Sequence, residues 1–107
     1  MATPYPVVRA RLDRAIADRD LDGVRSAARD LPSVVTLADA VRVLLLMLEA
    51  DDPAFDAAAV RWIARFTGEG GGVTLGEVHA AVEALHALPT PDAQATLTGL
   101  LKRHGLG

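Results

Sequence analysis

Two stretches of the chain, 38 residues apart, begin with the same helix-start signal. Thr36-Leu37-Ala38-Asp39 and Thr74-Leu75-Gly76-Glu77 each place a hydroxyl group three residues before a carboxylate, which is the spacing of a capping box. The same shift of 38 residues superposes Pro53 on Pro91. A two-helix unit that recurs with a period near 40 residues is typical of helical hairpin repeats, although any two capped helix pairs share some of these features. The sequence therefore predicts a chain built from paired helices.

The remaining helix signals divide the sequence into three hairpins, at about residues 5–32, 36–67 and 74–104. Alternating runs of β-branched or aromatic residues, which would indicate strands, are absent from the sequence. We predict an all-α fold of six short helices, arranged as three antiparallel hairpins in an α-solenoid-like stack. A compact six-helix bundle is the alternative. With 107 residues, the chain 1–107 has the length of one domain.

Local signals also predict where individual helices begin and end. Asp20 is expected to cap the second helix, and Asp52-Pro53 to open the fourth with an N-cap and a proline at the first helical position. Gly68 is expected to end the fourth helix and Gly105 the sixth. The third helix is apolar on almost every side along residues 41–48, so we expect it to be surrounded by other helices.

In unit length and in its construction from hairpins, roughly Thr36 to His104 resembles the HEAT and armadillo families of helical repeats. The resemblance is one of fold, without a diagnostic motif, and the Asp and Arg positions typical of HEAT units are missing. It implies a scaffold that binds other proteins.

Composition narrows the classes of function. The sequence has no cysteine, which excludes disulfides, thiol nucleophiles and zinc sites built on cysteine. Its only serines, Ser26 and Ser33, lie in no nucleophile motif. The N-terminal residues do not have the pattern of a signal peptide, and the longest apolar run, 43–48, is far shorter than the ~20 residues of a membrane span. We expect a non-enzymatic cytoplasmic protein without a cofactor and without a membrane partner.

One helix face presents a possible set of metal ligands. His79, Glu83 and His86 are spaced at i, i+4 and i+7, and imidazole and carboxylate groups both bind zinc. Each of them directly follows a predicted core position, however, which places the row on the flank of the buried face. A solvated flank is the favoured interpretation, and we predict no metal site.

Three arginines of the third and fourth helices form the second candidate site: Arg42, Arg61 and Arg65. Arg61 and Arg65 are like charges four residues apart, an unfavourable arrangement unless acidic groups meet them. They could bind a carboxylate or a phosphate of a ligand. The favoured interpretation is pairing within the chain, with the acidic candidates Asp39, Glu49 and Asp56.

The first hairpin is rich in arginine, with candidates for nucleic-acid binding at Arg9, Arg11, Arg14, Arg25 and Arg29. Aspartates interleave with them, and the whole chain carries 11 basic against 14 acidic residues. Because affinity for nucleic acids depends on neutralising phosphates, this balance makes nucleic acid an improbable partner. A solvated face of ion pairs is the expected result.

These observations favour a small adaptor or regulator that binds another protein or a second copy of itself. The apolar residues of the last helix, Leu97, Leu100 and Leu101, suggest that one end of the stack packs against such a partner. The alternative is a nucleic-acid-associated regulator that uses the arginine-rich first hairpin. A small-molecule pocket between hairpins is a third possibility.

Overall fold

Six helices joined by short connections make up the computed structural model, which describes residues 4–106. The elements are α1 (Tyr5–Ala17), α2 (Leu21–Asp30), a 3₁₀ turn η1 (Pro32–Val34), α3 (Leu37–Glu49), α4 (Phe55–Glu69), α5 (Leu75–Ala87) and α6 (Pro91–Arg103). No strand occurs between residues 4 and 106, so the all-α prediction is confirmed. Every helix in this part of the chain is too short or too polar to cross a lipid bilayer.

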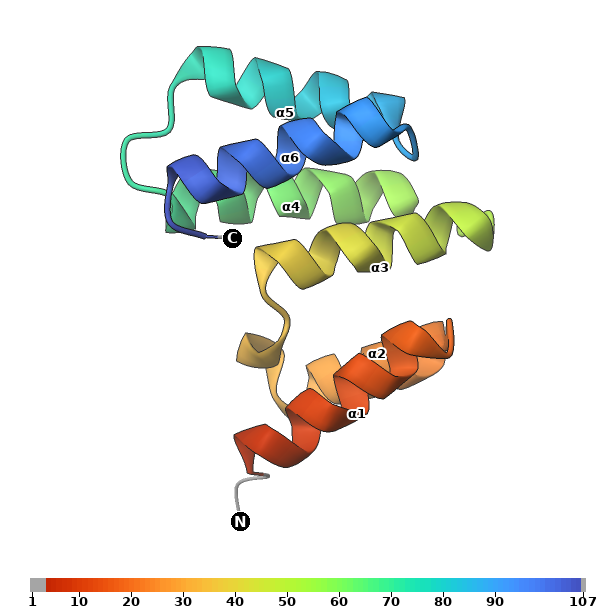
Figure 1. Ribbon diagram of the computed structural model, residues 1–107. Helices are drawn as coiled ribbons and strands as arrows, with labels where there is room; N and C mark the ends of the chain where they lie inside the picture. Colours follow the sequence, from red (N-terminus) through yellow and green to blue (C-terminus); the bar gives the residue numbers. More distant parts are fainter. Residues whose placement is uncertain (1–3, 107) are drawn as a thin grey trace.

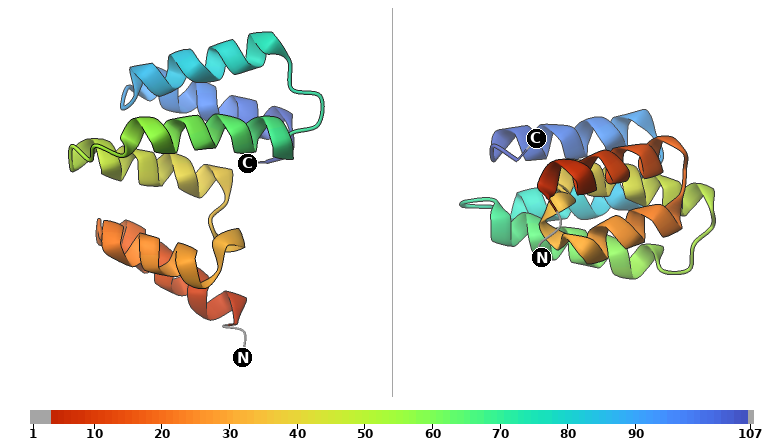
Figure 2. Two further views of the ribbon diagram at one scale, coloured as in Figure 1. Left: turned by 180° about the vertical axis from the view of Figure 1, so that it is seen from behind. Right: turned by 90° about the horizontal axis from the view of Figure 1, so that it is seen from below.

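The helices pair as three antiparallel hairpins, α1 with α2, α3 with α4 and α5 with α6, as predicted. The hairpins stack in chain order (Figure 1), and the view from behind shows the same layers (Figure 2). The second and third hairpins pack through two helix pairs, α3 with α6 and α4 with α5. The first hairpin packs mainly against α3, which therefore contacts four other helices and is the central element that its composition indicates.

Side-chain caps begin α2, α3 and α5 where the sequence predicted them. Thr36 Oγ1 accepts a hydrogen bond from the Asp39 backbone N–H (3.1 Å), and Thr74 Oγ1 accepts one from the Glu77 N–H (3.2 Å). In both cases the carboxylate accepts the threonine backbone N–H in return, which completes the capping box. Asp20 caps α2 as expected, its Oδ1 lying 3.0 Å from the Gly23 N.

The predicted start of α4 is wrong by two residues. The helix begins at Phe55 instead of Pro53, and the position of its N-cap is taken by Ala54 without a side-chain hydrogen bond. Asp52 Oδ1 accepts the Ala54 N–H at 2.9 Å and Asp52 O accepts the Phe55 N–H at 3.1 Å. These bonds close a turn around the proline, so that the aspartate caps this turn and not the helix.

The predicted end of α4 is also wrong, whereas that of α6 is confirmed. Gly68 lies inside α4, and a Cβ added there would meet no other atom within 4 Å. The last residue of the helix is Glu69, and Gly70 is its C-cap. A Cβ at Gly70 would lie 2.9 Å from the Phe66 carbonyl oxygen, so the close approach falls two residues later than expected. Gly105 follows α6 with φ of +69°, the left-handed conformation that glycine adopts most easily.

The apolar side chains form two clusters. The larger lies between the second and third hairpins, where Trp62 and Phe66 stack with ring centroids 5.3 Å apart and the Trp62 Nε1 donates to the Leu37 carbonyl oxygen at 3.1 Å. The smaller lies inside the first hairpin and includes Val8 and Leu12, together with Leu46 of α3.

The leucines of the last helix belong to the larger cluster. Leu97, Leu100 and Leu101 are at most 6% exposed. The suggestion that they form an apolar end surface is therefore wrong. They fall on the inner face of α6, where α3 and α5 cover them.

We predict that Leu44→Ala lowers the free energy of unfolding by about 2–5 kcal/mol, because Leu44 is 2% exposed at the centre of α3 and its truncation leaves a cavity. Urea denaturation followed by circular dichroism measures the change. The matched control is Leu75→Ala, since Leu75 is 88% exposed and should change stability by less than about 0.5 kcal/mol. Equal effects of the two substitutions would contradict the central position of α3.

Candidate functional site

An open apolar groove of about 530 Å³ runs between the first and second hairpins. We call it the inter-hairpin groove. Val43 and Leu44 of α3 line it, Val24 and Ala28 of α2 lie on one side, and Trp62 of α4 lies on the other. Helix α2 packs against α3 rather than against α4, and this arrangement leaves the space between α2 and α4 open. The groove thus follows from the way in which the first hairpin is docked.

Three arginines line this apolar space, Arg25 from α2 and Arg61 and Arg65 from α4, and no acidic residue does. Arg25 forms an ion pair with Asp52 at 2.5 Å, and Arg65 forms one with Glu69 at 2.8 Å. Arg61 is exposed and forms no ion pair within residues 4–106. The groove therefore combines an apolar interior with cationic edges.

The structure separates the three arginines that the sequence grouped. Arg61 and Arg65 both line the inter-hairpin groove, whereas Arg42 lies beside Asp39 at 4.0 Å and outside that groove. The other two acidic candidates point elsewhere. Glu49 pairs with Arg19 at 3.2 Å, and Asp56 lines a different groove on the far side of α4.

The structure also divides the row of possible metal ligands. His79 Nε2 lies 3.1 Å from Glu83 Oε1, and both side chains are at least 70% exposed. His86 instead lines a smaller groove between α4 and α5. No three histidine, aspartate or glutamate side chains between residues 4 and 106 lie close enough together to hold a metal ion.

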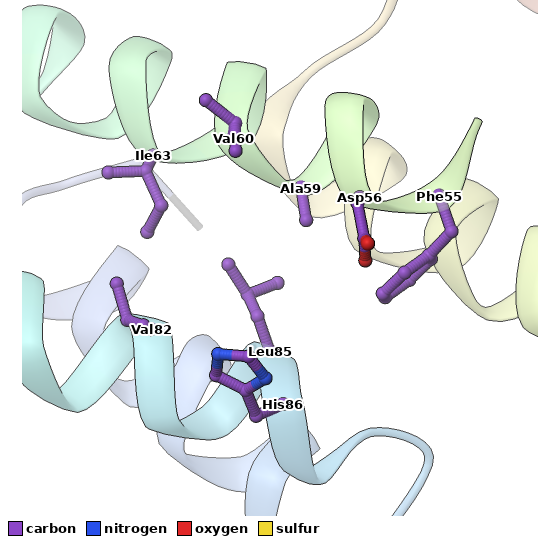
Figure 3. A pocket seen from close by; sticks show the side chains of 8 residues that line it. All are labelled: Phe55, Asp56, Ala59, Val60, Ile63, Val82, Leu85 and His86. Atoms are coloured by element: carbon purple, nitrogen blue, oxygen red, sulfur yellow. The ribbon is translucent and has the colours of Figure 1, made fainter. Parts of the chain in front are cut away.

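The smaller groove, of about 210 Å³, is shown in Figure 3. Phe55, Val60 and Ile63 of α4 face Val82 and Leu85 of α5 across it. Asp56 and His86 lie at the same end, but they form no hydrogen bond or ion pair with each other in the part of the chain described. This surface is apolar, and its two polar groups do not converge on a common point.

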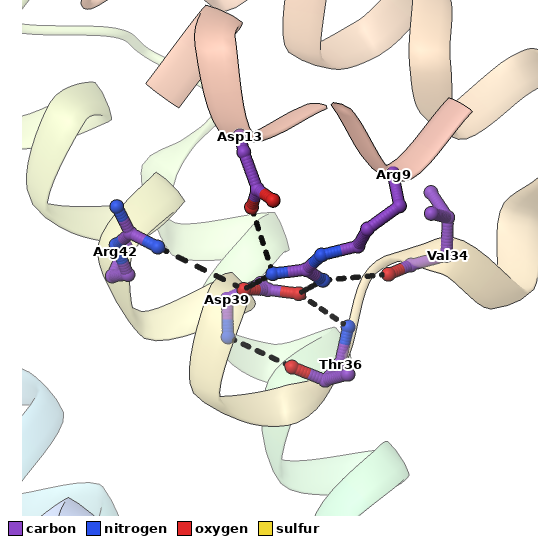
Figure 4. Close-up of polar contacts among 6 residues, drawn as sticks. All are labelled: Arg9, Asp13, Val34, Thr36, Asp39 and Arg42. Atoms are coloured by element: carbon purple, nitrogen blue, oxygen red, sulfur yellow. Dashed lines mark hydrogen bonds and ion pairs between the residues drawn. The ribbon is translucent and has the colours of Figure 1, made fainter. Parts of the chain in front are cut away.

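An ion pair between α1 and α3 sets the position of the first hairpin (Figure 4). The guanidinium of Arg9 contacts both carboxylate oxygens of Asp39, with Nη2 at 3.0 Å from Oδ1 and Nη1 against Oδ2. Arg9 also donates to the Val34 carbonyl oxygen and to Asp13. Asp39 is only 4% exposed, and the bidentate geometry fixes both partners. This pair holds the first hairpin against α3.

Asp39 stays ionised although it is buried. Burial by itself raises the pKa of its carboxyl group, but hydrogen bonds from Arg9 and Thr36 outweigh that effect and hold the pKa below its usual value. The same contact with Asp39 raises the pKa of Arg9. A carboxylate that accepts several hydrogen bonds in this way needs no water to solvate it.

No local pattern in the sequence distinguished Arg9 from the other arginines of the first hairpin. It was expected on a solvated face with the other arginines of the first hairpin, and Arg11 does lie there, paired with Asp30 at 2.6 Å. Arg9 departs from that expectation because its partner is 30 residues away in the sequence. The sequence around Asp39 indicated only that this residue belongs to a capping box, and not that Arg9 contacts it.

A second pair, which is partly buried, closes the third hairpin. His104 Nε2 lies 2.7 Å from Glu77 Oε2, and its Nδ1 lies 3.0 Å from the Gly71 carbonyl oxygen. The hydrogen bond from the Thr74 backbone, together with that from His104, lowers the pKa of the Glu77 carboxyl group. Through this contact the end of α6 is tied to the start of α5. It lies away from the inter-hairpin groove.

Comparison with protein-family models, with curated proteins and with solved structures finds no match to this chain. The inter-hairpin groove therefore has to be interpreted from its own chemistry. Its lining contains no serine, threonine, histidine, tyrosine, aspartate or glutamate, the residues that act as nucleophiles or as general acids and bases in most enzymes. What the groove offers is apolar contact and positive charge.

We predict that Asp39→Asn lowers the free energy of unfolding at pH 7 by about 3 kcal/mol, because Arg9 then loses its buried carboxylate and keeps only the exposed Asp13 as a charged partner. Since the folded pKa of Asp39 lies below the unfolded value of about 3.9, the carboxylate stabilises the fold above that pH. Its contribution is lost as the pH falls through the folded pKa. The difference between wild type and Asp39→Asn should therefore shrink toward pH 2–3, as measured by urea denaturation at both pH values.

The control for this prediction is Asp22→Asn. The side chain of Asp22 is 98% exposed and lies 3.8 Å from Arg25, so its replacement should change stability by less than about 0.5 kcal/mol at either pH. A gap between wild type and Asp39→Asn that stays constant with pH would contradict the role assigned to the ionised carboxylate.

Proposed function

We propose that this protein is a small non-enzymatic adaptor or regulator that binds a helical segment of another protein in the inter-hairpin groove. One observation carries the proposal, namely an apolar groove that lies open at the surface between two hairpins. Contiguous apolar surface of this kind on a small domain is a common feature of interaction sites. Grooves that receive the apolar face of a helix are a recurring mode of peptide recognition.

The dimensions of the groove fit a helix. Along α4 its lining extends from Ala54 to Arg65, which corresponds to about 16 Å or three turns at about 1.5 Å per residue. Small side chains lie along both sides, with Ala28 on α2 and Ala58 and Ala64 on α4. They leave room for a helix to approach closely while its larger apolar residues reach the floor.

The absence of general acids, general bases and nucleophiles from the lining favours binding over catalysis. The resemblance of residues 36–104 to HEAT and armadillo repeats agrees with a scaffold role, as an analogy of fold. The arginines of the first hairpin offer less support for nucleic-acid binding, because Arg9, Arg11 and Arg25 are each paired with an aspartate.

The test is to fill the groove. Ala64 is exposed and lines it, so Ala64→Phe should occupy the space without disturbing the core. We predict that proteins captured from the native host by the wild-type chain, identified by mass spectrometry, are lost when Ala64→Phe is the bait, because the added ring occupies the place of the partner helix.

Ala95→Phe is the matched control, since Ala95 is an exposed alanine of α6 that lies outside the groove. It should retain the captured proteins, and circular dichroism should show that both variants melt like the wild type. If Ala64→Phe captures the same proteins as the wild type, the inter-hairpin groove is not the binding site.

A further inference from the structure

We infer that the segment received by the inter-hairpin groove is an acidic amphipathic helix, with an apolar stripe flanked by carboxylates on both sides. The inference rests on the proposed function and specifies the chemistry of the partner. The charge of the residues that line the groove supports this inference. The chain has a net charge of −3, yet the groove is lined by three arginines and by no acidic residue. Positive charge thus lines this apolar groove although the protein as a whole is acidic.

Arg61 and Arg65 supply the first edge. They are one helical turn apart on α4, where two like charges repel each other unless acidic groups lie nearby. Within residues 4–106 the chain supplies Glu69 to Arg65 and no acidic partner to Arg61. Carboxylates three or four residues apart on a bound helix have the same spacing as these two arginines. An acidic helix would therefore meet both of them.

Arg25 supplies the opposite edge from α2. It pairs with Asp52 at 2.5 Å, and its side chain is still 51% exposed. Ion pairs that are exposed on both sides, such as Arg65–Glu69, contribute little to stability, and Arg25 keeps half of its side chain exposed beside Asp52. These arginines can therefore share or exchange their partners for the carboxylates of a ligand, and a helix in the groove has cations on both flanks.

The apolar interior distinguishes this partner from a nucleic acid. Val35 and Val43, which are partly exposed, line the groove between the arginines, and a phosphate backbone offers no apolar group to cover them. Both features of the groove are satisfied by a helix that has leucine-like residues on one face and carboxylates beside them.

Two designed peptides of about four helical turns test the inference. Both carry leucines at i, i+3, i+4 and i+7, and the positions that flank this stripe are glutamate in one peptide and lysine in the other. Trp62, which lines the groove, is the only tryptophan of the chain, so its fluorescence reports occupation of the groove. We expect saturable binding of the glutamate peptide, about tenfold tighter than that of the lysine peptide, and weaker as salt is added.

Arg61→Glu tests the assignment at one residue. We expect it to weaken binding of the glutamate peptide about fivefold and to strengthen binding of the lysine peptide. The control is Arg14→Glu, which makes the same change in net charge at an exposed arginine of α1 that lies outside the groove and forms no ion pair within residues 4–106. It should leave the preference for the glutamate peptide intact. Rescue by the lysine peptide excludes loss of folding as the cause.

Equal affinity for the two peptides, preference for the lysine peptide, or binding of neither would overturn the inference. So would an oligonucleotide that displaces the glutamate peptide from wild-type protein at physiological salt. None of these outcomes decides the proposed function, because groove-dependent capture of a partner is measured separately with Ala64→Phe. Loss of that capture with preference for the lysine peptide would leave a protein-binding groove whose ligand is basic.

Discussion

The ion pair between Arg9 and Asp39 fixes where the first hairpin lies, and the shape of the molecule beside α3 depends on it. Asp39 caps its own helix, accepts the Arg9 guanidinium and is almost sealed from solvent. A buried carboxylate without these partners would destabilise the fold, so the first hairpin can dock only where Arg9 reaches it. That docking places α2 opposite α4 and determines the width of the space between them. The candidate site is thus a consequence of an interaction on the other side of α3.

Local sequence signals predicted the helices well, because caps and apolar stripes act within about four residues. The paired capping boxes at Thr36 and Thr74, and the burial of Trp62, followed from such signals. The start of α4 did not, since the Asp52 side chain accepts the Ala54 N–H within the turn around Pro53 and therefore does not cap the helix. The docking of the first hairpin was beyond reach for a different reason. The contact joins Arg9 and Asp39, which are 30 residues apart. Such a separation produces no pattern at the three- or four-residue spacing of helices and turns.

The arginines illustrate the same limit. Sequence reasoning favoured pairing of Arg42, Arg61 and Arg65 with Asp39, Glu49 and Asp56. Of these pairs only Arg42 with Asp39 occurs, at 4.0 Å, whereas Arg65 pairs with Glu69 and Arg61 with no acidic side chain among residues 4–106. Asp56 is five residues before Arg61, which places it about 140° away around the helix. It therefore faces the groove of Figure 3, on the side of α4 opposite to Arg61. The side of α4 that bears Arg61 and Arg65 was consequently left with positive charge, next to an apolar space that only the stacking of hairpins creates.

The two separate apolar clusters have a consequence for how binding and docking influence each other. Leu46 belongs to the cluster of the first hairpin although it lies on α3, and Leu21 and Val43 pack against both clusters, so these three side chains join the two bodies. A ligand between α2 and α4 would touch both bodies and add to that junction. By reciprocity, docking of the hairpin must then favour the ligand by the same factor as the ligand favours docking. Arg9, which lies outside the groove, would accordingly control affinity from a distance, as an allosteric residue does.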